Sequence, residues 1–496
     1  MARRVLTIAV VAALAVAMAT AVGASVPARA AGGATNEPAW PTCRGGMQCT
    51  SFAVPASYDD PSGPQLSIAA ARVPAGDSSR RIGSLVVNPG GPGLSAIDVL
   101  TRLVAMLPAS ITDRFDIVAI DPRGVGRSAP VDCNVPLDPV FDHSFAPTTA
   151  RERDALVAAL QGVADACAAH DGARLTEVSS ADTARDMDVL RARMGDEQLT
   201  YLGFSYGTYL GALYAALFPS HVRALVLDGP VDPSVDARAS TLLQARGFER
   251  SLDDFLAWCS ARDDCAFGAD GDPATAYDAL RARIAMAPMP VDPSASGDRA
   301  GSVRLLNDTR LDAAVVEQLY GGRAAWPALA EALAEAARGH GDRLLAAADR
   351  FFGREPGGGD DGSVEAFWAV GCLDDPTAVG LADLQVRAQE VAPRVGAFVT
   401  NFGLACSVWP TRALPRTVVP SFDGAAPEAL VVGTTRDPAT PLVGAKGLAR
   451  LLGGAALVVA PGNRHTAIGS GNECVDETVA RYLVSPQAPM PSRRRC

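Results

Sequence analysis

Short apolar segments that end in turn residues recur along this chain and predict the strands of a sheet. Two of them, 115–120 (FDIVAI) and 199–204 (LTYLGF), are apolar almost throughout, which is typical of parallel strands covered on both faces. Further segments, either alternating or continuously apolar, are found at 66–73, 83–88, 224–227, 429–433 and 456–460.

Helical patterns lie between these segments. One apolar helix face falls within 184–194, and Ser179 is placed to cap that helix. A second helix is expected over 206–217, where Pro219 stops it. The alternation of strands and helices predicts an α/β fold with a mostly parallel sheet and helices on both of its faces.

After the fifth of these strands the character of the sequence changes. Residues 233–420 are mostly helical in pattern, with long polar breaks at 288–310 and 353–363. We therefore expect one sheet domain, formed by 40–232 and 421–496, that is interrupted by an inserted and mainly helical cap domain.

The first 30 residues have the pattern of a secretory signal peptide. Two arginines precede the apolar run 5–22, and Ala-Arg-Ala at 28–30 matches a small-residue cleavage site. The alternative, a membrane anchor, is disfavoured because weakly hydrophobic alanine dominates the run. We expect 1–30 to be removed and 31–39 to be a propeptide or linker. The protein would then be secreted or associated with the cell wall, without stable membrane insertion.

Ten cysteines, an even number, indicate disulfides in such an oxidising compartment. No C-x-x-C pair occurs, and the five histidines form no H-x-x-x-H pair, so these spacings indicate no metal site. Because short loops close at the lowest entropic cost, we expect consecutive cysteines to pair. The expected disulfides are Cys43–Cys49, Cys133–Cys167, Cys259–Cys265, Cys372–Cys406 and Cys474–Cys496.

Composition and charge narrow the choice of partners. Apolar residues make up 48% of the chain and charged residues 20%, which excludes a disordered or collagen-like protein. The formal net charge of −11 disfavours binding to nucleic acid or to anionic membranes. No motif indicates a cofactor, a monomer is expected by default, and the arginine run 493–495 is expected to be a solvated tail.

The segment 203–207 (GFSYG) matches G-x-S-x-G, follows a predicted strand and opens a predicted helix. This is the context of a nucleophile elbow, a sharp turn that holds its serine in a strained conformation. Glycines two positions before and after the serine give that turn room, and the helix N-terminus offers N–H groups to an oxyanion. We therefore expect Ser205 to be a catalytic nucleophile rather than part of a structural turn.

The partners of Ser205 follow by elimination, because the order along the chain in this type of site is Ser, acid, His. Only His340 and His465 come after Ser205. His340 is expected at a helix end within the cap, whereas His465 follows the last predicted strand and is the expected general base. Asp437 follows the preceding strand and is the expected acid, with Asp228, at the end of an earlier strand, as the alternative.

Two loops contain candidate donors for an oxyanion hole. The N–H group of Tyr206, directly after the nucleophile, is one candidate. The other lies in the glycine-rich loop 88–93 (NPGGPG), where Gly91 is the expected donor and Gly90 the alternative. A phosphate-binding loop is a weaker interpretation, because the Lys-Ser/Thr of a P-loop and the G-x-G-x-x-G spacing are both missing.

Another glycine-rich segment, 121–128 (DPRGVGRS), follows the 115–120 strand, and we expect Asp121 and Arg123 to brace the oxyanion loop. Together with the loop 88–93, the elbow, the segment GTTRDPATP around Asp437 and the segment before His465, it resembles the α/β-hydrolase-fold peptidases. In particular, the chain is similar to the secreted tripeptidyl aminopeptidases of actinomycetes, which are relatives of proline iminopeptidases.

This resemblance extends from about Trp40 to Leu483 and is weakest in the cap. The segments 370–374 (VGCLD) and 406–410 (CSVWP) look like the family's region between cap and C-terminal part, which favours the Cys372–Cys406 bridge. The resemblance implies an α/β-hydrolase fold, Ser205, Asp437 and His465 as the catalytic triad, and release of short peptides from free N-termini. One departure is Arg436, which stands before the acid where an apolar residue is common.

A serine exopeptidase acting through an acyl-enzyme is therefore the expected function, with peptides as substrates. Such an enzyme also needs an acidic group for the substrate ammonium. One alternative is a secreted carboxylesterase or lipase with the same triad, whose cap should form an apolar funnel. A second alternative is a non-catalytic cell-envelope binding protein of the same fold. The candidate ammonium-binding residues are Asp232, Glu365, Asp374 and Asp375.

Overall fold

The computed structural model describes residues 39–268, 271–292, 303–375, 382–414, 419 and 429–496. The expected signal peptide, and all but the last residue of the expected propeptide or linker, lie outside these ranges. Among the helices in these ranges, none is both long and apolar enough to cross a membrane.

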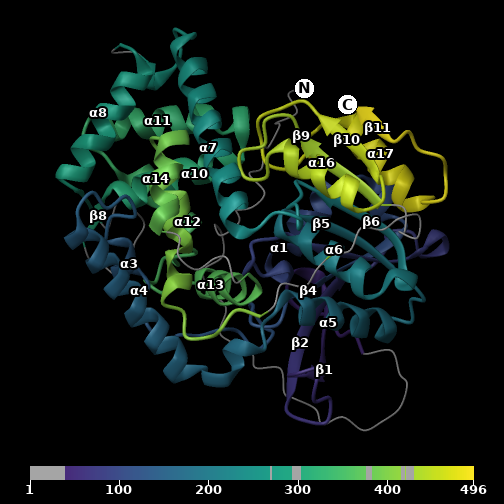
Figure 1. Ribbon diagram of the computed structural model, residues 1–496. Coiled ribbons are helices and arrows are strands. Elements are labelled where there is room, and N and C mark those ends of the chain that lie inside the picture. Colours follow the sequence, from purple (N-terminus) through teal and green to yellow (C-terminus); the bar gives the residue numbers. More distant parts are fainter. Residues whose placement is uncertain (1–38, 269–270, 293–302, 376–381, 415–418, 420–428) are drawn as a thin grey trace.

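Nine of the described strands form one sheet, at the right of Figure 1, in the order β1-β2-β4-β3-β5-β6-β9-β10-β11. The pairs β1–β2 and β2–β4 are antiparallel, and all the other pairs are parallel. The strands are β1 (Gln48–Pro55), β2 (Gln65–Val73), β3 (Gly83–Asn88), β4 (Phe115–Ile120), β5 (Leu199–Phe204), β6 (Val222–Asp228), β9 (Ala429–Thr434), β10 (Ala456–Ala460) and β11 (Arg493–Arg495).

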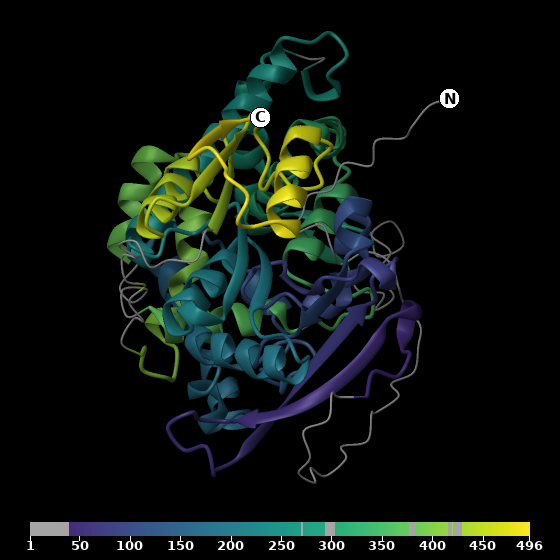
Figure 2. The same ribbon diagram turned by 90° about the vertical axis from the view of Figure 1, so that its right-hand side faces the viewer.

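Helices cover both faces of this sheet and bury its apolar side chains in two clusters. One cluster joins the sheet to α5 (Ser180–Arg193), α6 (Tyr206–Leu217) and α16 (Leu442–Leu451). The other joins it to α1 (Ala96–Met106), the short α2 (Ala109–Thr112) and α17 (Glu473–Val484). In Figure 2 the N-terminal strands lie at one end of the sheet and the C-terminal strands at the other.

The strands predicted from apolar runs are confirmed, and β3, β4, β5 and β10 begin and end at the predicted residues. The predicted helix 206–217 is α6, and Ser179 caps α5 by accepting a hydrogen bond from the Asp182 N–H group at 3.1 Å. The expectation of a solvated arginine tail is wrong. Residues 493–495 form β11, which pairs with β10 and so satisfies the backbone groups of an otherwise open sheet edge.

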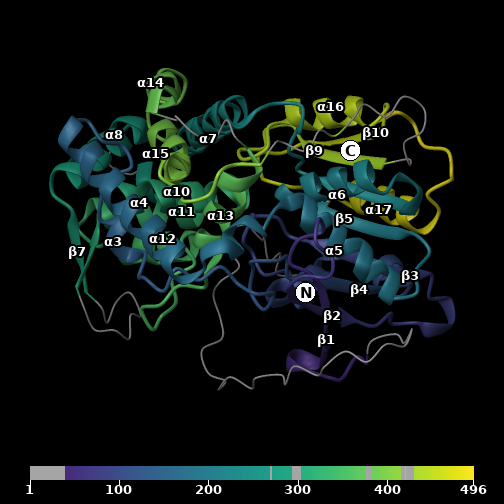
Figure 3. The ribbon, with the colours of Figure 1, turned by 60° about the horizontal axis from the view of Figure 1, so that its bottom comes forward.

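The cap lies to one side of the sheet, at the left of Figures 1 and 3, and its helices pack around one apolar core. A two-stranded ribbon, β7 (Met289–Val291) with β8 (Arg304–Leu306), interrupts the helices. The helices are α7 (Ala237–Ser260), α8 (Pro273–Met286), α10 (Asp308–Tyr320), α11 (Trp326–Ala337), α12 (Asp342–Phe351), α13 (Ser363–Asp374), α14 (Ala382–Val391) and α15 (Gly396–Phe402).

The cap also includes residues from the first half of the chain, which differs from the expected boundary at 232. Buried side chains between Val131 and Val178, which include those of α3 (Asp138–Phe141) and α4 (Ala150–His170), belong to the cap core. The segment 131–178 is therefore a second excursion from the sheet into the cap.

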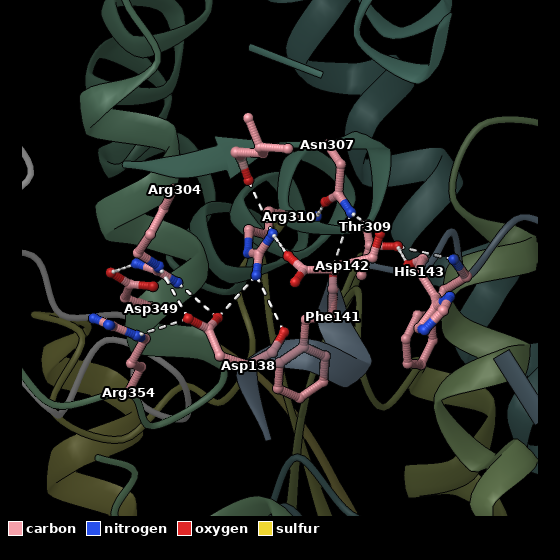
Figure 4. A network of polar contacts seen from close by, with 12 residues as sticks. Asp138, Phe141, Asp142, His143, Arg304, Asn307, Thr309, Arg310, Asp349 and Arg354 are labelled. Carbon is pink, nitrogen blue, oxygen red and sulfur yellow. Dashed lines mark hydrogen bonds and ion pairs between the residues drawn. The ribbon is translucent and has the colours of Figure 1, made fainter. Parts of the chain in front are cut away.

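A partly buried charge network joins α3 to the rest of the cap (Figure 4). Asp138 accepts hydrogen bonds from three arginines, Arg304, Arg310 and Arg354, at 2.8 to 3.2 Å. Burial would raise the pKa of Asp138, but the charge of Arg310 and the hydrogen bond from Arg304 hold it at about 2. Because each partner compensates the buried charge of the others, the network fixes where the 131–178 segment joins the cap.

The ten cysteines form five disulfides, and each cysteine is paired with its neighbour in the sequence, as expected from loop entropy. Cys133–Cys167 and Cys259–Cys265 lie within the cap, and Cys372–Cys406 joins α13 to the turn after α15. Cys474–Cys496 ties the residue after β11 to α17. No cysteine is left as a free thiol among the described residues.

Candidate active site

Ser205 occupies the turn between β5 and α6 in a strained backbone conformation, with φ 53° and ψ −124°. Its N–H group donates to the Asp228 carbonyl at 2.9 Å, which fixes the turn to the end of β6. The turn is tight, because a Cβ atom on Gly203 would lie only 2.4 Å from the Gly207 carbonyl oxygen. This geometry is the one the G-x-S-x-G pattern predicts, and it leaves Ser205 8% exposed.

His465 follows β10 and is fully buried beside Asp437, which follows β9. The Nδ1 atom of His465 lies 2.9 and 3.0 Å from the two carboxylate oxygens of Asp437. An imidazole that donates from Nδ1 to a carboxylate keeps Nε2 unprotonated and able to accept a proton. Nε2 is buried and has no hydrogen-bond partner among the described residues.

Groups of the turn that follows Asp437 help to hold the Asp437–His465 pair in place. The N–H groups of Ala439 and Thr440 donate to one Asp437 oxygen at 3.0 and 2.8 Å. The Thr440 hydroxyl lies 3.2 Å from His465 Nδ1, so Nδ1 has both Asp437 and Thr440 beside it. We did not expect Thr440 from the sequence, although it lies in the same turn as Asp437.

Asp228, the alternative acid, forms no hydrogen bond with His465 among the described residues. Its carboxylate accepts hydrogen bonds from the N–H groups of Ala467 and Ile468, each at 2.8 Å. Burial raises the pKa of Asp228 to about 6, against the effect of these two donors. Asp228 therefore orients the chain just after His465. His340, the alternative base, is exposed between α11 and α12.

Gly229 lies where the nucleophile turn and the histidine loop meet. Its φ is 64°, and a Cβ atom there would lie 3.0 Å from His465 Cε1 and 2.9 Å from Thr466 Cγ2. Thr466 itself has φ 63°, an unusual value for a β-branched residue. Strained backbone thus occurs on both sides of the site, at Ser205 and at Thr466. Nothing in the local sequence around Gly229 indicated this contact.

The loop 88–93 packs directly on Ser205. A Cβ atom on Gly90 would lie 2.9 Å from Ser205 Cβ and 3.1 Å from the Tyr206 nitrogen. The Gly90 N–H group already donates to Asn88 Oδ1 at 2.9 Å. The Gly91 N–H group donates no hydrogen bond within the described ranges, which leaves it available to an incoming acceptor.

In the segment 121–128, Asp121 and Arg123 were both expected to brace the loop 88–93, and only Asp121 does so. Asp121 accepts hydrogen bonds from the Ser95 hydroxyl at 2.8 Å and the Ile97 N–H group at 3.1 Å, and so holds the start of α1 just after the oxyanion loop. The expectation for Arg123 is wrong. Its guanidinium forms a bidentate pair with Asp186 of α5, at 2.8 and 2.7 Å, and does not reach the oxyanion loop.

The four candidate acids for a substrate ammonium are held by different partners. Asp232 accepts from Ser234, and Asp375 accepts from the first N–H group of α7. Glu365 is 3% exposed, and burial together with the nearby Asp360 raises its pKa to about 8. Asp374 accepts from the Ser180 N–H group at 2.9 Å. Among the described residues, no group of His, Cys, Asp or Glu is arranged to hold a metal ion.

The cap directly contacts the loops that carry His465 and Asp437. The Tyr320 carbonyl, at the end of α10, accepts from the His465 N–H group at 3.0 Å, and the Tyr320 ring lies edge-on to the imidazole at 5.4 Å. Arg436 pairs with Asp254 of α7 at 2.5 and 2.6 Å, so its departure from the family pattern provides a contact between cap and core. No local sequence signal placed Tyr320 at the site, because the contact joins distant parts of the chain.

Comparisons with known proteins agree with this geometry. A family described as alpha/beta hydrolase fold matches residues 83–293, and one described as TAP-like protein matches 392–496. The chain is 35% identical over 482 residues to serine protease Hip1 of Mycobacterium tuberculosis, covering 92% of this chain and 90% of that protein. It is 35% identical over 469 residues to carboxylesterase B of the same organism, covering 90% and 86%. It is 31% identical over 452 residues to tripeptidyl aminopeptidase of Streptomyces lividans, covering 88% and 82%. The chain therefore belongs to the α/β-hydrolase family that includes serine protease Hip1 and the tripeptidyl aminopeptidases.

Proposed function

We propose that this protein is a serine exopeptidase that hydrolyses peptide bonds near a free N-terminus, with Ser205, His465 and Asp437 as its catalytic triad. The observation that carries the proposal is the buried Asp437–His465 pair next to the nucleophile elbow, with His465 Nε2 unpartnered among the described residues. The likeness to serine protease Hip1 and to tripeptidyl aminopeptidase supports peptides as the substrate class.

In the first half of the reaction, Ser205 Oγ attacks the scissile carbonyl carbon while His465 Nε2 takes the serine proton. Asp437 keeps the imidazole oriented and stabilises the positive charge that it gains. The N–H groups of Gly91 and Tyr206 hold the oxyanion. His465 then gives the proton to the leaving amine, and the acyl group remains on Ser205.

In the second half, a water molecule attacks the acyl-enzyme carbonyl, and His465 Nε2 accepts the water proton. The tetrahedral intermediate collapses, Ser205 Oγ leaves with the proton held by His465, and the peptide acid is released. The nucleophile and base are not hydrogen-bonded to each other in this structure. Such contacts are often long without substrate and tighten when it binds.

A free substrate N-terminus requires an acidic partner, and Asp232, Glu365, Asp374 and Asp375 remain the candidates. An acid that is ionised at neutral pH binds an ammonium group best, because a protonated carboxyl carries no charge. The raised pKa of Glu365 argues against it at neutral pH. Asp374, the last residue of α13, is connected to Tyr206 by hydrogen bonds through Ser180, and Asp375 follows it directly.

Export of the protein is part of the proposal. Five disulfides suit an oxidising compartment, and the expected signal peptide over 1–30 would direct the chain there. N-terminal sequencing of the protein recovered from culture medium and cell wall would test this. A mature chain that still begins at residue 1 would contradict it.

The catalytic assignment is tested with a fluorophosphonate probe and matched tripeptide amides. Ser205 should be labelled in the wild type, and Ser205→Ala should abolish both labelling and hydrolysis. The tripeptide amide with a free N-terminus should be cleaved at least about tenfold faster than its acetylated form, since a lost charge-assisted contact costs about that much. Equal rates would contradict the exopeptidase assignment but not the triad.

A carboxylesterase is the second candidate, because the chain is 35% identical to a protein named carboxylesterase B. The same triad would then act on an ester, and the acid for an ammonium would be unnecessary. Comparing kcat/KM for short-chain 4-nitrophenyl esters with that for free tripeptide amides separates the two functions. Faster ester cleavage together with no effect of N-terminal acetylation would favour the esterase.

A further inference from the structure

Helix α13 lies on the side of the cap that faces the sheet, as Figures 1 and 3 both show. Its first turn rests on the oxyanion loop. A Cβ atom on Gly93 would lie 2.2 Å from the Ser363 carbonyl oxygen and 3.0 Å from the Phe367 nitrogen. Backbone therefore packs on backbone at this point, beside the proposed donor Gly91.

The last residue of α13 reaches the other proposed donor through a chain of hydrogen bonds. Asp374 accepts from both groups of Ser180, from its N–H group at 2.9 Å and from its hydroxyl. The Ser180 hydroxyl is also hydrogen-bonded to the Tyr206 hydroxyl. Because the Ser180 proton points to Asp374, the Tyr206 hydroxyl must be the donor to Ser180.

The protonation states suit this direction. Burial and the charge of Asp374 raise the pKa of Tyr206 well above its usual value, so the phenol keeps its proton. Burial raises the pKa of Asp374 to about 6, against the two Ser180 donors and with a contribution from the nearby charges of Asp182 and Asp375. At neutral pH the chain therefore runs from a phenol through a hydroxyl to a carboxylate.

Helix α13 is itself firmly attached to the cap. The Trp368 indole N–H donates to the Phe402 carbonyl at 2.9 Å, and the Cys372–Cys406 disulfide lies one turn further on. Ser180, in contrast, is the first residue of the core helix α5. The hydrogen-bond chain thus crosses from cap to core and ends on the residue that follows the nucleophile.

We propose that Asp374 and Ser180 are positioning residues of the oxyanion hole, which act through the Tyr206 hydroxyl to hold the Tyr206 backbone N–H group toward the substrate oxyanion. This inference rests on the proposed function, in which that N–H group is a donor. Tyr206 is the first residue of α6, and its N–H group moves with the first turn of that helix. The Tyr206 side chain is anchored at its hydroxyl, which restricts this movement. Because the anchor ends at Asp374, the cap helps to position the Tyr206 N–H group.

The test is a double-mutant cycle with Tyr206→Phe, Asp374→Ala and the combined variant, assayed on a neutral 4-nitrophenyl ester and a free tripeptide amide. Removal of a whole oxyanion donor lowers kcat by about 100-fold or more. A donor that is present but less firmly positioned should therefore lower kcat by about 10-fold. We expect each single variant to lose about 10-fold in kcat on both substrates, with KM within about twofold. The combined variant should lose no more than Tyr206→Phe alone, because both changes break the same chain.

Asp254→Ala is the matched control, because it removes another cap–core contact, the one with Arg436, without touching the hydrogen-bond chain. It should leave kcat unchanged. Asp374→Asn keeps an acceptor for the Ser180 N–H group and should recover part of the activity lost in Asp374→Ala. If Asp374→Ala fails to fold, the same cycle is run with Asp374→Asn.

The proposal is overturned if the two losses in kcat multiply. With about 10-fold lost in each single variant, the combined variant would then lose about 100-fold. A rise in KM for the free tripeptide amide alone, with kcat on the ester unchanged, would also overturn it and would make Asp374 an ammonium ligand. Failure of the proposed function itself is distinguishable, because it would be shown by activity retained in Ser205→Ala or by equal rates on the free and acetylated tripeptide amides. Neither result depends on the hydrogen bonds between Asp374, Ser180 and Tyr206.

Discussion

His465 Nδ1 lies 2.9 and 3.0 Å from the two carboxylate oxygens of Asp437, whereas the equally buried carboxylate of Asp228 accepts hydrogen bonds from the backbone that follows His465. The two acids therefore differ in what they hold. Asp437 sets the tautomer of the His465 imidazole, and Asp228 sets the path of the loop.

This difference predicts unequal effects of the two isosteric amide substitutions. Asp437→Asn should lower kcat by about 10⁴-fold, because an amide favours the wrong imidazole tautomer. Asp228→Asn keeps one carbonyl oxygen for the Ala467 and Ile468 N–H groups and should lower kcat by no more than about 10-fold. Steady-state kinetics on one ester substrate measures both. Equal losses in the two variants would show that Asp228 acts on the imidazole as well.

Gly229→Ala should slow the enzyme strongly without unfolding it. The substitution adds a methyl group 3.0 Å from His465 Cε1 and 2.9 Å from Thr466 Cγ2, at a positive φ that alanine adopts at a cost of about 1 kcal/mol. The imidazole must then move, and a shift of about 1 Å in such a group costs about 100-fold in rate. We expect this loss in kcat/KM, with a melting temperature only a few degrees lower.

Gly195→Ala is the matched control for Gly229→Ala. Gly195 has φ 75°, and nothing lies within 4 Å of the place its Cβ atom would take. The control therefore introduces the same backbone strain without pressing on the site, and it should reduce stability slightly and leave kcat/KM unchanged. Wild-type activity in Gly229→Ala would mean that the histidine loop yields to the methyl group.

Glu365 predicts a dependence of stability on pH. Burial and Asp360 raise the pKa of this 3% exposed carboxyl from 4.5 to about 8, so the folded protein keeps a proton that the unfolded chain has lost. The stabilising effect is complete below pH 4.5 and is lost as the pH rises toward 8, by at most about 1.4 kcal/mol per pH unit. The wild type should therefore become less stable across this range.

Glu365→Gln isolates this contribution, because glutamine has the shape and hydrogen-bonding groups of a protonated glutamate. The variant and the wild type should melt together at pH 5, and the variant should melt higher at pH 8. Differential scanning calorimetry at several pH values measures the difference in melting temperature between the two proteins. The contributions of all other titrating acids are the same in both and cancel in this difference. Parallel curves would show that Glu365 is ionised in the folded protein.

Much of the sheet and of the arrangement of the proposed catalytic residues could be predicted from the sequence, because both depend on local patterns. Buried parallel strands are short apolar runs, and the loops that carry Ser205, Asp437 and His465 each follow such a run. Catalytic residues at the carboxyl ends of parallel strands are then brought to one edge of the sheet without further information.

Contacts between distant segments could not be predicted in this way. The Asp374–Ser180 contact joins residues 194 positions apart, and the Tyr320–His465 contact crosses from cap to core. Helix α4 has a pattern equally suited to covering the sheet, and only its packing shows that it belongs to the cap. Arg123 was misplaced for the same reason, since its partner Asp186 is 63 residues away.

The Cys474–Cys496 disulfide should stabilise the sheet edge rather than the site. It ties the residue after β11 to α17, and β11 covers the backbone groups of β10. Replacing both cysteines by serine removes a cross-link between residues 22 positions apart, which corresponds to about 3 kcal/mol in the loop-entropy model. We expect a lower melting temperature and more aggregation, because an open β10 edge is a template for pairing with other chains.

The double replacement Cys43→Ser/Cys49→Ser is the control for Cys474→Ser/Cys496→Ser, because it removes a disulfide that closes a much shorter loop. Its effect on the melting temperature should be smaller. The hydrolysis rate, divided by the amount of Ser205 that fluorophosphonate labels, should match the wild type in both double variants. The reason is that Asp437 and His465 lie before Cys474 and are held by their own loops. A lower rate per labelled site in the Cys474→Ser/Cys496→Ser pair would show that β11 also supports the histidine loop through β10.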